Sequence, residues 1–95
     1  MAVWGLIVES TQGAGEGRQW ACEVAGRVTG TREDALRALE TFASTYRPTH
    51  PRRPKRVRLF RQQEGLLLIS EGTFETFHTR FTVAELLHDS APERG

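Results

Sequence analysis

The sequence contains one cysteine, Cys22, one lysine, Lys55, and no long hydrophobic run. A single cysteine cannot form a disulfide within the chain, and it fits a reducing, cytoplasmic environment. The longest apolar runs, residues 6–8 and 66–69, are too short to cross a bilayer, so we expect no membrane segment. The first residues lack the basic stretch of a signal peptide, and we therefore expect none.

The composition is typical of one small globular protein. Of the 95 residues, 38% are hydrophobic and 26% are charged, which argues against a fibrous or largely disordered chain. We predict a single domain over residues 1–95, with a basic, proline-rich connector at about 47–56 and a frayed tail at 91–95.

Hydrophobic periodicity predicts five strands and two helices. Alternation indicates strands, and a 3.6-residue repeat after Thr31, a favourable N-cap, indicates a helix that Pro48 ends. Thr82 and Glu85 have the spacing of a capping box and predict a second, short helix. The fold class is α+β, an antiparallel sheet in the order strand, strand, helix, strand, strand, strand, helix, with both helices on one face. The predicted strands are 3–9, 18–29, 56–62, 66–70 and 73–81, and the second helix lies within 82–90.

Two features of the first predicted hairpin bear on function. The glycine-rich segment 10–17 precedes a strand and lacks a following Lys-Ser/Thr, so it predicts a hairpin turn and not a phosphate-binding loop. In the next strand Trp20, Cys22 and Val24 share one side, which we expect to face inward, with Cys22 as an inert core thiol. Gly26 predicts a bend or bulge in that strand.

Two predicted strands are apolar on both sides, and two helices can cover only one face of the sheet. The uncovered face must therefore curl onto itself or meet another chain, and we expect a homodimer or a surface for a protein partner. The side chains concerned are Val3 and Ile7 against Leu6 and Val8, and Leu66 and Leu68 against Leu67 and Ile69.

No catalytic or cofactor motif is present. Catalysis by Cys22 with His78 or His88 would need a thiolate poised by a base, but Cys22 lies within the alternation of a strand, the expected environment of an inert core thiol. The histidines His50, His78 and His88, with Asp89, lack metal-ligand spacing. Glu71 and Glu75 flank a predicted turn and do not form a convincing acid–base pair. We expect a protein that is not an enzyme, with no cofactor, no metal and no small-molecule substrate.

The most distinctive feature is the charge of residues 46–61. This segment holds seven of the thirteen Lys and Arg and no acid, so it carries +7 while the remainder carries −6. It predicts a phosphate-binding surface, a docking strip for an acidic protein, or a solvated connector in which Arg58 pairs with Glu71 or Glu75 across strands. The candidate binding residues are Arg47, Arg52, Arg53, Lys55, Arg56, Arg58 and Phe60.

Two resemblances follow from these segments. From Thr31 onward, the predicted order helix, three strands, helix resembles the double-stranded-RNA-binding domain, although the short "TVAELLHDS" lacks that family's Lys-rich terminal helix and no binding residue carries over. "YRPTHPRRPKR" and "FHTRFTVAELLHDS" resemble small proteins of GC-rich actinobacteria, a likeness that implies no particular activity.

The sequence thus favours a small non-catalytic protein-interaction or regulatory module. We expect it to be homodimeric and to use a sheet face and the basic segment. The alternative is a nucleic-acid-binding protein that uses residues 47–61.

Overall fold

The chain forms one five-stranded antiparallel sheet and one helix. The computed structural model describes residues 1–12, 19–48, 51 and 53–91. Most of the predicted glycine-rich turn and the last four residues of the predicted tail lie outside these ranges. The elements are β1 (Val3–Gln12), β2 (Gln19–Thr29), α1 (Arg32–Thr45), β3 (Arg56–Gln62), β4 (Gly65–Glu71) and β5 (Thr76–Glu85).

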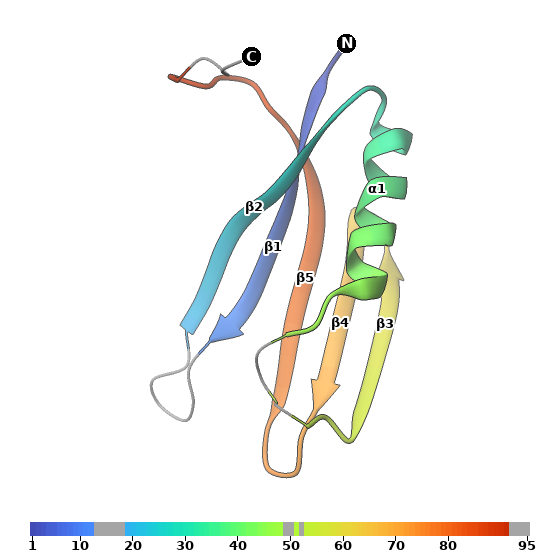
Figure 1. Cartoon of the computed structure of the whole chain (residues 1–95), viewed down its shortest axis with the longest axis vertical. Helices are drawn as coiled ribbons and strands as arrows, with labels where there is room; N and C mark the ends of the chain where they lie inside the picture. Colours follow the sequence, from blue (N-terminus) through green and yellow to red (C-terminus); the bar gives the residue numbers. More distant parts are fainter. Residues whose placement is uncertain (13–18, 49–50, 52, 92–95) are drawn as a thin grey trace.

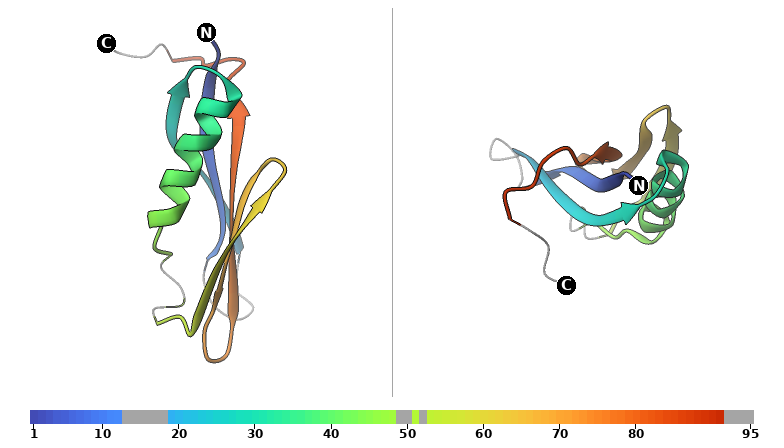
Figure 2. Two further views of the ribbon diagram at one scale, coloured as in Figure 1. Left: turned by 90° about the vertical axis from the view of Figure 1, so that its right-hand side faces the viewer. Right: turned by 90° about the horizontal axis from the view of Figure 1, so that it is seen from above.

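The sheet has the order β2-β1-β5-β4-β3, and each neighbouring pair is antiparallel. α1 carries the chain from one edge strand, β2, to the other, β3, and β5 then returns to the centre beside β1 (Figure 1). The helix lies on one face of the sheet and leaves the other face uncovered (Figure 2). The register shift of the β1–β2 pair places a bulge at Ala25, next to Gly26, where a bend is predicted.

α1 begins and ends where its flanking residues predict. The Thr31 hydroxyl accepts a hydrogen bond from the Asp34 N–H at 3.1 Å, and the Asp34 carboxylate accepts one from the Thr31 N–H at 3.0 Å. This reciprocal capping box satisfies two N–H groups that the helix itself leaves free. At the other end Tyr46 is already extended, two residues before Pro48.

The core lies between α1 and the sheet. Phe81 is fully buried, and its ring meets the rings of Phe42 and Tyr46 edge-on, with centroids 6.0 and 5.2 Å away. Burying a side chain of this size contributes about 1.5–3 kcal/mol. The other buried residues of this cluster are Leu6, Val8, Leu39, Ala43, Leu66 and Leu68.

The prediction of a second helix is wrong. Residues 82–85 continue β5 beside β1, with Thr82 opposite Ile7 and Val83 opposite Leu6. The Leu86 N–H extends the pairing by donating to the Val3 carbonyl at 2.8 Å. β1 is ten residues long and offers backbone partners for the whole of this stretch, whereas an isolated two-turn helix is unstable in water.

The likeness to a double-stranded-RNA-binding domain fails for the same reason. That topology ends in a helix, and residues 82–91 contain none. In addition, β1 pairs with β5, so the first hairpin is an integral part of the same sheet.

α1 has 14 residues. Within the part of the chain that the structure describes, no helix has the length and hydropathy needed to span a membrane.

Candidate functional site

One face of the sheet has no helix over it, and we call it the open face. Cross-strand partners share a face, so the register assigns its side chains. Trp20, Val24 and Phe60 are 53%, 64% and 43% exposed. Large apolar and aromatic side chains are usually more deeply buried than this. The larger apolar side chains of the open face include Ile7, Trp20, Val24, Phe60, Leu67 and Ile69, and its charged side chains and histidine are Glu9, Arg27, Arg56, Arg58, Glu71, His78 and Arg80.

The inward orientation predicted for Trp20, Cys22 and Val24 is wrong. The alternation is as predicted, but this side of β2 belongs to the open face because α1 packs against the other side. Cys22 is consequently exposed and is not a core thiol. Val28, beyond the bulge at Ala25, is the β2 residue that packs against the core.

Charges on the open face nearly cancel. The Glu71 carboxylate forms ion pairs with Arg58 at 3.4 Å and with Arg56 at 3.9 Å. The cross-strand pairing of Arg58 with Glu71 is thus confirmed. Glu9 and Arg80 are direct cross-strand partners. Two arginines also lie near aromatic rings, with Arg80 5.8 Å from the Trp20 centroid and Arg58 5.7 Å from that of Phe60.

The open face is hollowed where β1 begins and where β2 and β5 end. The hollow has a volume of about 370 Å³ and is largely apolar. The Arg27–Asp89 ion pair, at 2.6 Å, lies at its border. The Ala91 N–H, and then Arg27, lower the pKa of Asp89 below its ordinary value, so this carboxylate stays charged at neutral pH. The apolar lining consists of Val3, Gly5, Ile7, Val24, Ala84 and Leu86.

The structure divides the predicted basic segment into a paired and an unpaired part. Arg56 and Arg58 pair with Glu71 on the open face, and Arg61 pairs with Glu40 of α1 at 2.9 Å. Phe60 lies on the open face beside Arg58. The exposed side chains of Arg47, Arg53 and Lys55 have no acidic partner among the described residues, and Arg52 lies outside those residues.

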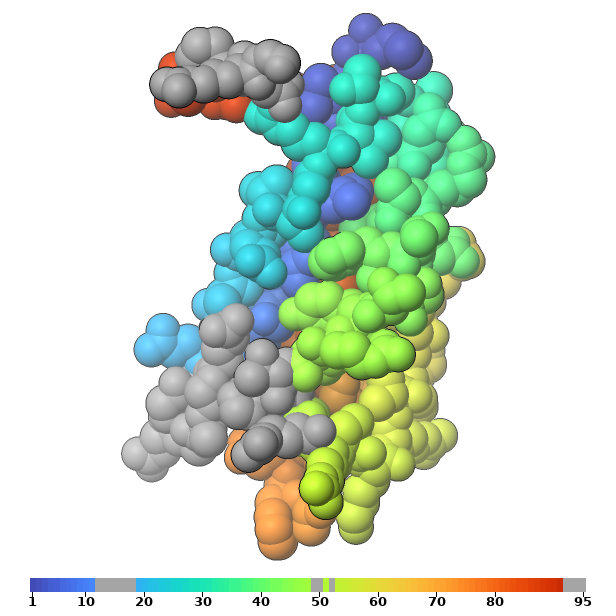
Figure 3. Space-filling model, viewed as in Figure 1, coloured from blue at the N-terminus to red at the C-terminus, as the bar shows by residue number. Residues whose placement is uncertain are grey.

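A second hollow lies on the helix side, at the start of β3, and we call it the proline hollow. It has a volume of about 400 Å³. α1 packs on β1, β2, β4 and β5. In Figure 3 the lower part of β3 (yellow) lies beyond the end of the helix (green). The β3 side chains Val57 and Leu59, on the helix side of the sheet, are 50% and 40% exposed. The lining residues are Tyr46, Arg47, Pro48, Pro51, Pro54 and Val57. No sequence pattern predicts this hollow, because it depends on how the chain returns to the sheet after α1.

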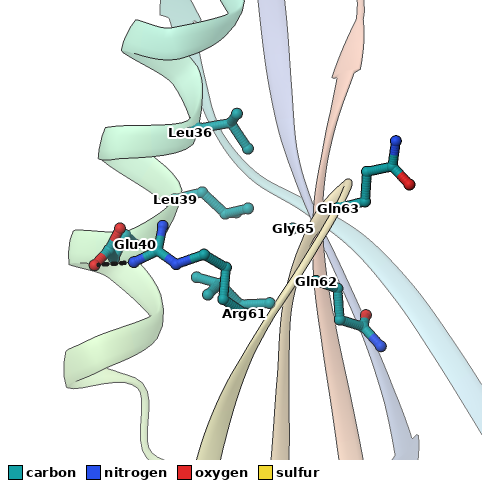
Figure 4. Close-up of a pocket in the computed structure, with 8 residues that line it drawn as sticks. Leu36, Leu39, Glu40, Arg61, Gln62, Gln63 and Gly65 are labelled. Carbon is teal, nitrogen blue, oxygen red and sulfur yellow. Dashed lines mark hydrogen bonds and ion pairs between the residues drawn. The ribbon is translucent and has the colours of Figure 1, made fainter.

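A smaller gap of about 120 Å³ separates α1 from the β3–β4 hairpin. Leu36 and Leu39 form its apolar wall, and Figure 4 shows Arg61 reaching across to Glu40 while Gln62 and Gln63 point away from the helix. A second ion pair, Arg32 to Glu64 at 2.9 Å, also joins the helix to the hairpin. The gap is bridged by exposed ion pairs and is too small for a ligand of ordinary size.

The candidate catalytic and metal-binding residues are not brought together. Cys22 and His78 lie exposed on the open face, His88 is exposed beyond β5, and Asp89 is paired with Arg27. Among the described residues, no cluster of three or more His, Cys, Asp or Glu could hold a metal ion. His50 lies outside the described residues.

Comparisons with protein-family models, with curated proteins and with solved structures found no match. The likeness of two segments to small actinobacterial proteins therefore stays a sequence-based expectation.

Proposed function

We propose that the chain is a small, non-catalytic, cytoplasmic protein-interaction module that forms a homodimer through its open face. The observation that carries the proposal is the exposure of large apolar side chains on a face that no helix covers. Val24 and Phe60 are 64% and 43% exposed, and Ile7, Leu67 and Ile69 are only partly buried. Exposed apolar side chains gathered on one face are typical of interfaces.

The dimensions of the molecule allow a stable interface. The two longer principal extents are 45 and 26 Å. A standard protein–protein interface buries roughly 800 Å² on each partner, which the sheet face can supply. Two sheets pack face to face at a separation of about 10 Å, so two open faces can pack together as a sandwich with one α1 on each outer side.

The charges of the open face favour a second copy as the occupant. The face carries four arginines and, with Asp89, three carboxylates. A two-fold interface places each surface against itself, and a surface with both signs can then match arginine to carboxylate. A nucleic acid requires a clear excess of positive charge, which this face lacks.

Sedimentation velocity over a concentration series tests the proposal. We expect a dimer at tens of micromolar. Val24→Glu should weaken it at least tenfold, because the symmetric interface would hold two unpaired carboxylates. Val57→Glu is the matched control, since Val57 is a similarly exposed strand valine (50% against 64%) on the helix side. A monomeric wild type, or a dimer that Val24→Glu leaves intact, would contradict the proposal.

A further inference from the structure

We propose that the proline hollow is a second docking surface, separate from the open face, and that it binds an acidic peptide segment carrying one bulky apolar side chain. The three features that lead to this ligand are the walls of the hollow, the charge around it and the aromatic residue beneath it.

The walls are mostly apolar, with three prolines among the lining residues. Pro48, Pro51 and Pro54 have fixed φ angles, and Val57 closes the hollow from β3. At about 400 Å³ the hollow falls within the range of ligand pockets and is large enough for a leucine or phenylalanine side chain. The three proline side chains lose little conformational entropy when a ligand binds, which favours affinity.

The charge around the hollow is positive and unneutralised. Arg47 lines it, and Arg53 and Lys55 flank Pro54 in the sequence; all three are exposed and have no acidic partner within the described part of the chain. The arginines further along, by contrast, are paired with Glu71 or Glu40. An acidic ligand therefore gains three attractive interactions here, and a second copy of this chain would place like charges together.

The aromatic residue at the hollow favours a peptide over a nucleic acid. Nucleic-acid platforms stack bases on exposed aromatic faces. The Tyr46 ring is committed to the core, at 5.7 Å from Phe42 and 5.2 Å from Phe81, and Phe60 lies on the opposite face of the sheet. Burial raises the pKa of Tyr46, so its hydroxyl stays neutral and does not oppose an anionic ligand.

Fluorescence anisotropy with defined probes tests the proposal. The probes are a labelled hexapeptide, Asp-Glu-Asp-Phe-Asp-Glu, the same peptide with Ala in place of Phe, and a labelled hexathymidylate. We expect the Phe peptide to bind at physiological salt, and the Ala peptide and the oligonucleotide to bind at least tenfold more weakly. Val57→Glu and the double variant Arg53→Glu/Lys55→Glu should each reduce affinity for the Phe peptide at least tenfold.

Two control variants show whether a loss is local. Arg37→Glu reverses an exposed charge on α1, and Val24→Glu changes the open face; both should keep wild-type affinity. Circular dichroism establishes that each variant is folded, and a milder Val57→Ser replaces Val57→Glu where that variant fails to fold. The proposal is overturned by any of three results: no binding of the Phe peptide, equal or tighter binding of the oligonucleotide, or unchanged affinity in the folded Val57 variant.

Discussion

The close pairing of β4 with β5 at Phe81 and Thr82 can be tested with a single methyl group. Gly65 begins β4 and lies opposite Thr82 of β5. A Cβ atom at Gly65 would lie 1.9 Å from the Phe81 carbonyl oxygen and 3.1 Å from the Thr82 Cα. Because close carbon–oxygen contacts are about 3.3 Å long, Gly65→Ala must push the two backbones apart by roughly 1.4 Å.

The loss of stability in Gly65→Ala follows from the rigidity of the neighbouring strand, β5. Overpacking costs about 1–3 kcal/mol, and a displaced strand end also loses ladder hydrogen bonds worth about 1 kcal/mol each. We expect Gly65→Ala to lower the free energy of unfolding by about 3 kcal/mol, which lowers Tm by roughly 12–24 °C in a domain of this size. Gly26→Ala is the matched control, since its Cβ would meet only the Leu6 side chain at 3.7 Å; we expect a change within about 0.5 kcal/mol, or a slight gain.

Urea unfolding, followed by tryptophan fluorescence and circular dichroism, measures the free energy of unfolding of both variants and of the wild type. The comparison also tests the pairing of β4 with β5 at the point where the predicted strand 73–81 would end. A Gly65→Ala variant as stable as Gly26→Ala would contradict the close approach of Gly65 to the Phe81–Thr82 peptide.

Three further predictions concern the helix, and Leu59→Ala on β3 is the control for the first. Leu39→Ala should cost about 2–5 kcal/mol because Leu39 is fully buried, whereas Leu59→Ala, at a residue 40% exposed, should cost less than about 1 kcal/mol in the same urea assay. Thr31→Ala removes the N-cap and should cost about 1 kcal/mol, measured as a lower urea midpoint. The Thr31 N–H and hydroxyl, with Arg37, lower the pKa of Asp34 below its ordinary value of 3.8. The stabilisation from Asp34 is therefore complete above that value and is lost as pH falls through the lower folded pKa. Urea midpoints from pH 5 downward should decline less steeply in Asp34→Asn than in the wild type, because the other carboxylates still titrate in the variant.

The elements whose signals are local were predictable from the sequence. β3 spans 56–62 as predicted, because its alternation is bounded by Pro54 and by the turn before Gly65. The start of α1 follows from Thr31, whose capping requires only the next three residues. The pairing of Arg58 with Glu71 follows from alternation combined with a short hairpin, which fixes the register.

The predictions that failed depended on distant parts of the chain. Thr82 and Glu85 have the spacing of a capping box, but ladder positions on β1, some 75 residues earlier, decide their conformation. The side of β2 that faces the core likewise depends on which face α1 occupies, and alternation in β2 is the same for either choice. The proline hollow requires the chain after α1 to pass Val57, and periodicity carries no information about that path.

The open face and the proline hollow lie on opposite sides of the sheet, so the two proposed interactions predict a specific linkage. In a face-to-face dimer the hollows point outward, and the shortest extent of 22 Å per chain sets them about 44 Å apart across two layers. Two copies of the acidic hexapeptide joined by a Gly/Ser linker of about 60 residues, with an r.m.s. length near 43 Å, should reach both. Avidity should then tighten apparent binding to the wild type by roughly tenfold or more relative to the single peptide. Val24→Glu, as a monomer, should bind one copy with unchanged affinity and show no such gain. An equal gain in Val24→Glu, measured by titration calorimetry alongside its sedimentation, would show that the dimer does not present the hollows in this way.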